Sequence, residues 1–197
     1  MPNIESIKQF CPIRRVGNGT YNHFFGYYNK SIWDETGRHL LSQRIPMTTG
    51  DLTGKEIAEV GFFDLECNDF YQVIGHTSSW NWQMGCQLQW LENSEKWQII
   101  YNARRETSTK VDTHYPDFSS ILYNIESNEK KELPLPVYVV SPNSKYALSV
   151  DYSRFQVTHP TIGYHATKLE PNLEYAPEND GIYWMDIDTG EVKLIIS

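Results

Sequence analysis

Arginine side chains lie at or next to the end of three segments of similar layout, and together they could bind an anion. Arg44 is the penultimate residue of LLSQRI, Arg104 and Arg105 end IIYNARR, and Arg154 is the penultimate residue of SVDYSRF. A guanidinium binds a carboxylate or phosphate through two parallel hydrogen bonds. If the segments share one rim, they predict an anion-binding surface on a chain whose net charge is −8. The alternative is that each arginine pairs with a neighbouring acid, such as Asp151 or Glu106, and only ties loops together.

Aromatic and amide side chains in two further segments could complete this surface. SSWNWQMG contributes two tryptophans and a glutamine, and YNHFFGYYNK contributes a histidine and tyrosines. Aromatic rings stack on the C–H faces of a sugar, while amides and guanidiniums bind its hydroxyl and carboxylate groups. The predicted ligand-binding set is therefore Arg44, Arg104, Arg105, Arg154, Trp80, Trp82, Gln83, His23 and Tyr27. Packing between sheets is the alternative for Trp80 and Trp82, and it is our prediction for Trp33, Trp90 and Trp184, which lie inside strand patterns.

No motif in the sequence fixes a reaction. The six histidines show no HExxH or comparable metal spacing, and no nucleophile elbow or phosphate-binding glycine loop is present. We therefore predict neither catalytic residues nor a metal site. The segment 156–180 contains prolines and reads as a loop that could cover the rim or simply lie on the surface.

The elements that must position these residues repeat along the chain. Three units each contain two pairs of apolar segments, and each pair is joined by a polar turn. Aligning the turns places Asp64, Asn124 and Asp186 in register, at intervals of 60 and 62 residues. Each unit should therefore contain four strands, which in the first unit are Phe24–Trp33, His39–Ile45, Glu59–Leu65 and Phe70–His76. We expect no helix.

Four antiparallel strands per repeat predict an all-β fold, a β-propeller of about three four-stranded antiparallel blades. The blades would span residues 21–77, 82–136 and 137–197 of a single domain, 1–197. A β-sandwich is the alternative, but it has no reason to repeat about every 60 residues. Because propellers close with about four to eight blades, we expect a partial, truncated propeller. Otherwise, copies would associate through exposed blade edges.

Composition excludes several classes of partner. With 17 basic and 25 acidic residues, the chain as a whole should bind neither nucleic acid nor an anionic membrane surface. No apolar run is long enough for a membrane span, and the N-terminus lacks the apolar core of a secretory signal. The three cysteines are widely spaced and odd in number, as expected for free thiols. These features predict a cytoplasmic protein.

Four segments carry a resemblance to a known family: HFFGYYNKSIWD, WNWQMGCQLQWL, VYVVSPNSKYALSVDYSRF and DGIYWMDIDTGEVKLIIS. They resemble a group of bacterial β-propellers of poorly known function, related to the TolB-like propellers and, more distantly, to oligogalacturonate lyase. The similarity spans residues 21–197, and the greater length of the group's members implies a missing C-terminal half. In oligogalacturonate lyase, later blades hold a divalent metal. The resemblance therefore implies no cofactor for these three units, although a full-length relative could carry that metal.

The main functional hypothesis is a binding module whose arginine and aromatic rim recognises an anionic carbohydrate or similar polyanion. A lyase or hydrolase of acidic oligosaccharides is the first alternative, with its catalytic groups in later blades. A protein-interaction scaffold, in which the rim contacts a partner chain, is the second.

Overall fold

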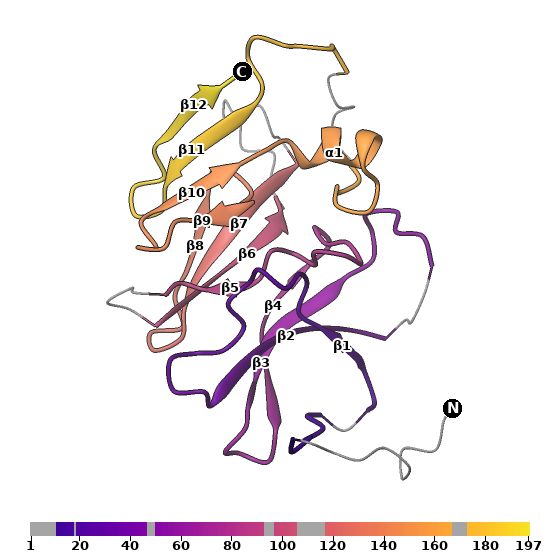
Figure 1. Ribbon diagram of the computed structural model, residues 1–197, viewed down its shortest axis with the longest axis vertical. Coiled ribbons are helices and arrows are strands. Elements are labelled where there is room, and N and C mark those ends of the chain that lie inside the picture. The colour runs from indigo at the N-terminus through magenta and orange to yellow at the C-terminus, as the bar shows by residue number, and fades with distance from the viewer. Residues whose placement is uncertain (1–10, 18, 47–49, 93–96, 106–116, 167–172) are drawn as a thin grey trace.

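Three four-stranded antiparallel sheets, formed one after another along the chain, make up the structure (Figure 1). The computed structural model describes residues 11–17, 19–46, 50–92, 97–105, 117–166 and 173–197. Sheet 1 contains β1 (Asn22–Phe24), β2 (His39–Ile45), β3 (Ala58–Asp64) and β4 (Phe70–Thr77). Sheet 2 contains β5 (Gln89–Trp90), β6 (Gln98–Arg104), β7 (Phe118–Asn124) and β8 (Lys130–Leu133). Sheet 3 contains β9 (Val139–Val140), β10 (Tyr146–Ser149), β11 (Ile182–Asp186) and β12 (Val192–Ile196).

The aligned turn residues occupy the same place in all three sheets. Asp64, Asn124 and Asp186 are the last residues of β3, β7 and β11. Each side chain accepts a hydrogen bond from a backbone N–H two or three residues later, at 2.7–3.1 Å. Such Asx turns start the hairpin that leads to the outer strand. The repeat read from the sequence therefore corresponds to a repeated sheet, which confirms the all-β prediction with four antiparallel strands per sheet.

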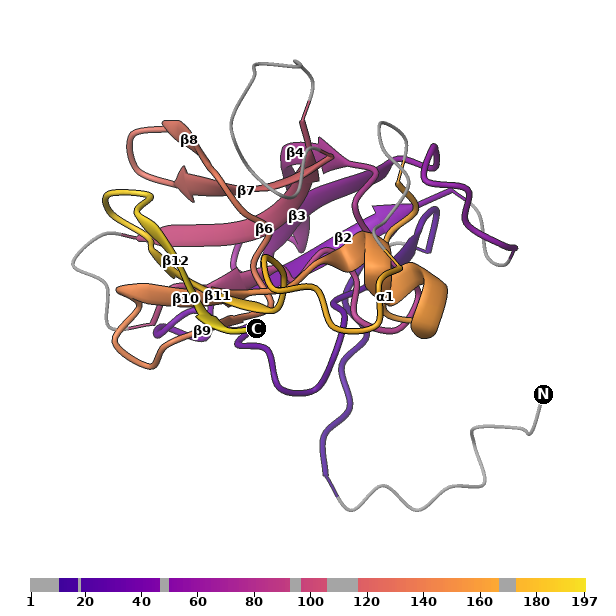
Figure 2. The same ribbon diagram turned by 90° about the horizontal axis from the view of Figure 1, so that it is seen from above.

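Sheet 2 lies between the other two and is buried on both faces. One apolar core joins sheets 1 and 2 and includes Ile99 and Tyr101 of β6. A second core joins sheets 2 and 3 and includes Ile100 of the same strand. Because neighbouring side chains on a strand point to opposite faces, β6 supplies both cores. The sheets are therefore stacked in chain order, with the hairpin turns of sheets 2 and 3 at the left in both views (Figures 1 and 2).

The first strand of sheet 1 is shorter than predicted. A continuous strand over 24–33 is wrong, because β1 ends at Phe24 and a turn follows, in which the Lys30 N–H donates to the Tyr27 carbonyl at 3.2 Å. Gly26 permits this path: its φ is +100°, and a Cβ there would lie 2.5 Å from the Met84 carbonyl oxygen. Pairing resumes only at a single bridge between Trp33 and Leu40.

One helix replaces a predicted strand end. The strand expected through SVDYSRF stops at Ser149, and α1 (Tyr152–Thr158) follows. The Asp151 carboxylate caps α1 by accepting hydrogen bonds from the N–H groups of Ser153 and Arg154, at 2.8 and 3.3 Å. Arg154 therefore lies on a helix rather than at a strand end. Among the described residues, no helix is long and apolar enough to cross a membrane.

The tryptophans predicted to lie in the core differ in exposure. Trp90 is buried, as predicted, and Trp184 is half-buried. The prediction for Trp33 is wrong, because this side chain is 48% exposed.

The double burial of sheet 2 gives a stability test. We expect Ile99→Ala and Ile100→Ala each to lower the free energy of unfolding by about 3 kcal/mol, because each removes a fully buried side chain from a different core. Ile195→Ala, at a site 46% exposed, should change it by less than about 1 kcal/mol. Denaturant titration measures all three. A large loss for only one of the two β6 variants would contradict the stacked arrangement.

Candidate functional site

A cavity of about 500 Å³ lies beside the turn that links sheet 1 to sheet 2. We call it the Trp82 pocket. Its walls come from three segments distant in sequence: residues 50–56 before β3, residues 78–83 after β4, and residues 156–165 from α1 onward. Three predicted site residues, Trp80, Trp82 and Gln83, line it.

An Asx turn presents the aromatic wall. The Asn81 carboxamide oxygen accepts hydrogen bonds from the N–H groups of Gln83 and Met84, at 3.1 and 2.7 Å. A backbone bridge between Asn81 and Gly85 closes the loop. Gly85 has φ +60°, and a Cβ there would lie 2.1 Å from Nε2 of Gln43, so a larger residue would strain the backbone and displace the Gln43 side chain. This tight loop leaves the side chains of Trp82 and Gln83 exposed at the pocket.

The two indoles have different roles. Trp80 is buried in the core between sheets 1 and 2, and its Nε1–H donates to the Glu56 carbonyl at 2.7 Å. Trp82 stands edge-on to Trp80, with ring centroids 5.2 Å apart, and is 40% exposed. Its Nε1–H donates to the Gly50 carbonyl at 2.9 Å, which fixes the ring orientation. Trp80 is thus a packing residue that supports the accessible ring of Trp82.

The opposite wall is held against this turn by direct hydrogen bonds. The Asn81 Nδ2 donates to the Ile162 carbonyl at 2.9 Å, across 81 residues of chain. Gln156 and His165 lie side by side, with 3.1 Å between Nε2 atoms, and both line the pocket. Gly163 allows the close return of the chain, since a Cβ there would lie 2.0 Å from the Gln156 nitrogen.

The charged groups at the pocket are mainly acidic. Asp51 and Glu56 line it, and no lysine or arginine does so among the residues that the structure describes. Burial opposes ionisation of Glu56, but hydrogen bonds from Thr53, Gly54 and Lys55 lower the pKa of its carboxyl to about 2. The pocket therefore keeps a negative charge at neutral pH, together with the amides of Gln83 and Gln156.

The predicted arginines do not share this pocket. Arg44 forms an ion pair with Glu59, and its guanidinium lies between the rings of Tyr21 and Tyr71, 4.1 and 4.4 Å from their centroids. Arg154 pairs with Asp180 at 3.1 Å and donates to the Glu174 carbonyl.

Arg104 and Arg105 are engaged within the fold too. Arg104 donates to the His165 carbonyl at 2.7 Å and to the Ser78 hydroxyl at 3.1 Å, behind the wall of the Trp82 pocket. Arg105 is 8% exposed and binds Glu132 and two backbone carbonyls of sheet 2 and its outgoing link. Each predicted arginine thus has an internal partner, as in the alternative interpretation of the sequence, and Glu106, which that alternative names, lies outside the described residues.

His23 and Tyr27 lie elsewhere. His23 pairs with Arg44 in the β1–β2 register, and both line a separate cavity with Phe63 and Tyr71. Burial, with a smaller contribution from Arg44, lowers the pKa of His23. Tyr27 packs against Tyr28, with ring centroids 4.3 Å apart.

Sequence reasoning missed two of the three walls. The segment 50–56 carries a usable signal, since Thr53, Gly54 and Glu56 form a self-capped turn. The segment 156–165 belongs to the stretch 156–180, which the sequence predicts to be a lid or a surface loop, but its first residues form the end of α1.

No protein-family model matches the chain, and no curated protein or solved structure is significantly similar to it. The resemblance to TolB-like propellers thus stays a prediction. Among the described residues, no group of three or more histidine, cysteine, aspartate or glutamate side chains could hold a metal ion.

The hydrogen bonds to Glu56 give a pH test. Its folded pKa of about 2 lies below the ordinary value of 4.5, so its stabilising contribution is complete above about pH 4.5 and is lost as the pH falls toward 2. We expect Glu56→Gln to lower the free energy of unfolding at pH 7, and the difference from the wild type to shrink as the pH falls from 5 to 3. Urea titrations at several pH values measure this difference.

Glu178→Gln is the matched control. Glu178 is exposed and makes no hydrogen bond or ion pair among the described residues, so its substitution should have little effect at any of these pH values. A Glu56→Gln effect that does not change with pH would contradict the assignment.

Proposed function

We propose that the three sheets are successive blades of a β-propeller. Two observations support this proposal: each sheet is made of consecutive antiparallel strands, and each core joins only neighbouring sheets. In a two-layer sandwich, a sheet would bury one face only. In a propeller, the loops that enter first strands and leave second strands gather at one mouth, where the Trp82 pocket would lie. The kinship with TolB-like propellers and the cytoplasmic location belong to the same proposal.

We further propose that the protein is a carbohydrate-binding module that takes its ligand at the Trp82 pocket. The observation that carries this proposal is the exposed, hydrogen-bonded indole of Trp82, which borders a cavity that also contains Gln83, Gln156 and Asp51. A fixed aromatic face with amides and carboxylates around it matches the two surfaces of a sugar ring, its C–H face and its hydroxyl edge.

The charges favour an uncharged saccharide over the anionic one expected from the sequence. Two carboxylates line the pocket, and the four predicted arginines are engaged inside the fold. An acidic sugar would have to break these contacts and approach Glu56, at a cost in Coulomb energy. An anionic saccharide, a lyase or hydrolase of acidic oligosaccharides, and a protein-interaction scaffold stay as the alternatives.

The test uses Trp82→Ala with a panel of neutral and uronate-containing oligosaccharides. We expect one or more neutral saccharides to bind the wild type. Their affinity for Trp82→Ala should be at least about tenfold weaker, because this substitution removes the ring on which the sugar stacks. Trp82→Phe should retain part of the affinity. Calorimetry or saturation-transfer NMR measures binding, and thermal unfolding confirms that each variant is folded.

Trp184→Ala serves as the matched control, since Trp184 packs against Tyr146 in sheet 3 and lines none of the described cavities. If uronates bind more tightly than neutral sugars, and Arg104→Ala abolishes the binding of uronates, the ligand is anionic. The appearance of an unsaturated uronide in ultraviolet absorbance would indicate a lyase. Binding to no member of the panel would remove the carbohydrate proposal.

A further inference from the structure

A second cavity, of about 470 Å³, lies at the opposite end of sheet 1 from the Trp82 pocket. It borders His39, where β2 begins, whereas the Trp82 pocket borders Glu56 and Ser78, next to the start of β3 and the end of β4. Because β2 and β3 are antiparallel and β3 and β4 are antiparallel, these positions mark opposite ends of the sheet. Three of the six tryptophans, Trp33, Trp90 and Trp97, line the second cavity, which we call the tryptophan slot.

The indoles of the slot are held in place by the fold. Trp90 and Trp97 are stacked, with an interplanar angle of 5° and ring centroids 5.7 Å apart. Trp90 is buried, and its Nε1–H donates to the Ile32 carbonyl at 3.1 Å. The rings of His39 and Trp97 pack edge to face, with their centroids 4.6 Å apart. Trp33 differs, because it is 48% exposed although its strand pattern predicts a core residue. An exposed indole beside two ordered ones leaves aromatic surface available to a ligand.

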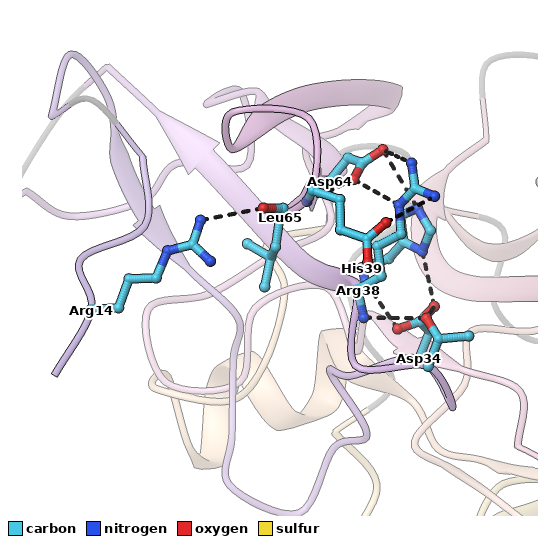
Figure 3. Close-up of polar contacts among 8 residues, drawn as sticks. Arg14, Asp34, Arg38, His39, Asp64 and Leu65 are labelled. Carbon is cyan, nitrogen blue, oxygen red and sulfur yellow. Dashed lines mark hydrogen bonds and ion pairs between the residues drawn. The ribbon is translucent and has the colours of Figure 1, made fainter. Parts of the chain in front are cut away.

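Among the described residues, Arg38 and His39 are the basic side chains that line the slot, and both face carboxylates. Arg38 donates to both carboxylate oxygens of Asp64, at 2.8 and 2.5 Å, and lies 3.5 Å from Glu66 (Figure 3). This pairing lowers the pKa of the Asp64 carboxyl to about 2. The His39 ring bonds Asp34 at 2.8 Å through Nδ1 and lies 3.9 Å from Asp64 through Nε2 (Figure 3). The Arg38 guanidinium is thus already bound by Asp64 and Glu66 of the β3–β4 hairpin and would have to break these ion pairs to bind an anion.

Carboxylates without such partners surround the indoles. Glu35, Glu92 and Glu126 line the slot and are exposed. Within the described part of the chain, the carboxylates of Glu35 and Glu126 make no hydrogen bond or ion pair, and Glu92 accepts one hydrogen bond, from the Ser31 hydroxyl. These carboxylates, with the buried carboxylate of Asp34, make the electrostatic potential in the slot negative.

We propose that the tryptophan slot binds a small organic cation, with a methylated ammonium group as its recognised part. Such a group is attracted by the faces of aromatic rings within about 6 Å and by carboxylates, and it is weakly hydrated enough to leave water. A compact metal ion would gain nothing from indoles, and an anion would be repelled by the carboxylates of Glu35, Glu92 and Glu126. A neutral apolar ligand would use the rings but not the glutamates. The combination of both groups in one cavity selects the organic cation.

The test titrates the whole protein with choline and, in parallel, with 3,3-dimethylbutan-1-ol, its uncharged isostere. In two-dimensional NMR, we expect choline to shift the indole N–H signals of Trp33, Trp90 and Trp97 saturably, while that of Trp82 stays in place. The isostere should bind at least about fivefold more weakly. Trp33→Ala should lower the choline affinity about fivefold or more, and it should not unfold the protein, since Trp33 is half exposed.

Two further variants separate the contributions. Glu35→Gln combined with Glu126→Gln keeps the shape of the slot, and we expect it to weaken choline binding and to flatten its dependence on salt concentration. Trp184→Ala should leave choline binding unchanged. Equal affinity for choline and the isostere, or an undiminished choline affinity in Trp33→Ala, would overturn the proposal. Because Trp82 is absent from the slot, failure here leaves the carbohydrate proposal standing, and the reverse also holds.

Discussion

The fold depends on one buried residue, Asn102 of sheet 2, which hydrogen-bonds to the end of sheet 1 and to the link that leads to sheet 3. Asn102 lies on β6 and is fully buried. Its Oδ1 accepts a hydrogen bond from the Val137 N–H at 2.6 Å, and its Nδ2 donates to the Val137 carbonyl at 2.9 Å, on the link to sheet 3. Its backbone carbonyl accepts a hydrogen bond from the Thr77 hydroxyl, at the end of sheet 1. A buried polar group left without its partner costs about 1–3 kcal/mol, so this pairing fixes where sheet 3 leaves sheet 2.

The same carboxamide also positions the wall of the Trp82 pocket. Asn102 Nδ2 approaches the Tyr164 hydroxyl at 3.3 Å, and the Tyr164 ring stacks on Tyr152 of α1 with centroids 4.2 Å apart. Tyr152 in turn donates its hydroxyl proton to the Val137 carbonyl at 3.0 Å. Both rings are fully buried and pack with Phe118 in a small third core. Residues 156–165 are thus tied to the centre of the sheets, which gives the pocket a rigid second side opposite the Asn81 turn.

The sequence predicts what is local and misses what is not. Strand and turn patterns depend on neighbouring residues, and for this reason the hairpins at Asp64, Asn124 and Asp186 and the exposed turn at Trp82 could be located. The ion-pair partners of the arginines could not be predicted because they are distant in sequence: Arg44 pairs across the β2–β3 hairpin, and Arg154 pairs with an acid 26 residues away. The helix was missed because its seven residues carry too little periodicity, although Asp151 followed by Ser153 is a cap signal. The exposure of Trp33 was missed because alternation does not reveal where a strand is interrupted.

The placement of the arginines explains the character of both cavities. The chain is acidic overall, with 25 acidic and 17 basic residues, and Arg38, Arg44 and Arg154 are bound to acids of the hairpins and links. Positive charge is therefore used inside the fold, while carboxylates such as Glu35, Glu126 and Asp51 stand at the cavities. In both places an exposed indole lies beside these carboxylates. Because like charges repel in a site of reduced dielectric constant, such surfaces favour ligands that are neutral or cationic. The number of indoles then distinguishes the ligand expected in one cavity from the ligand expected in the other. One ring with amides suits a sugar face, whereas three rings with unpaired glutamates suit an ammonium group.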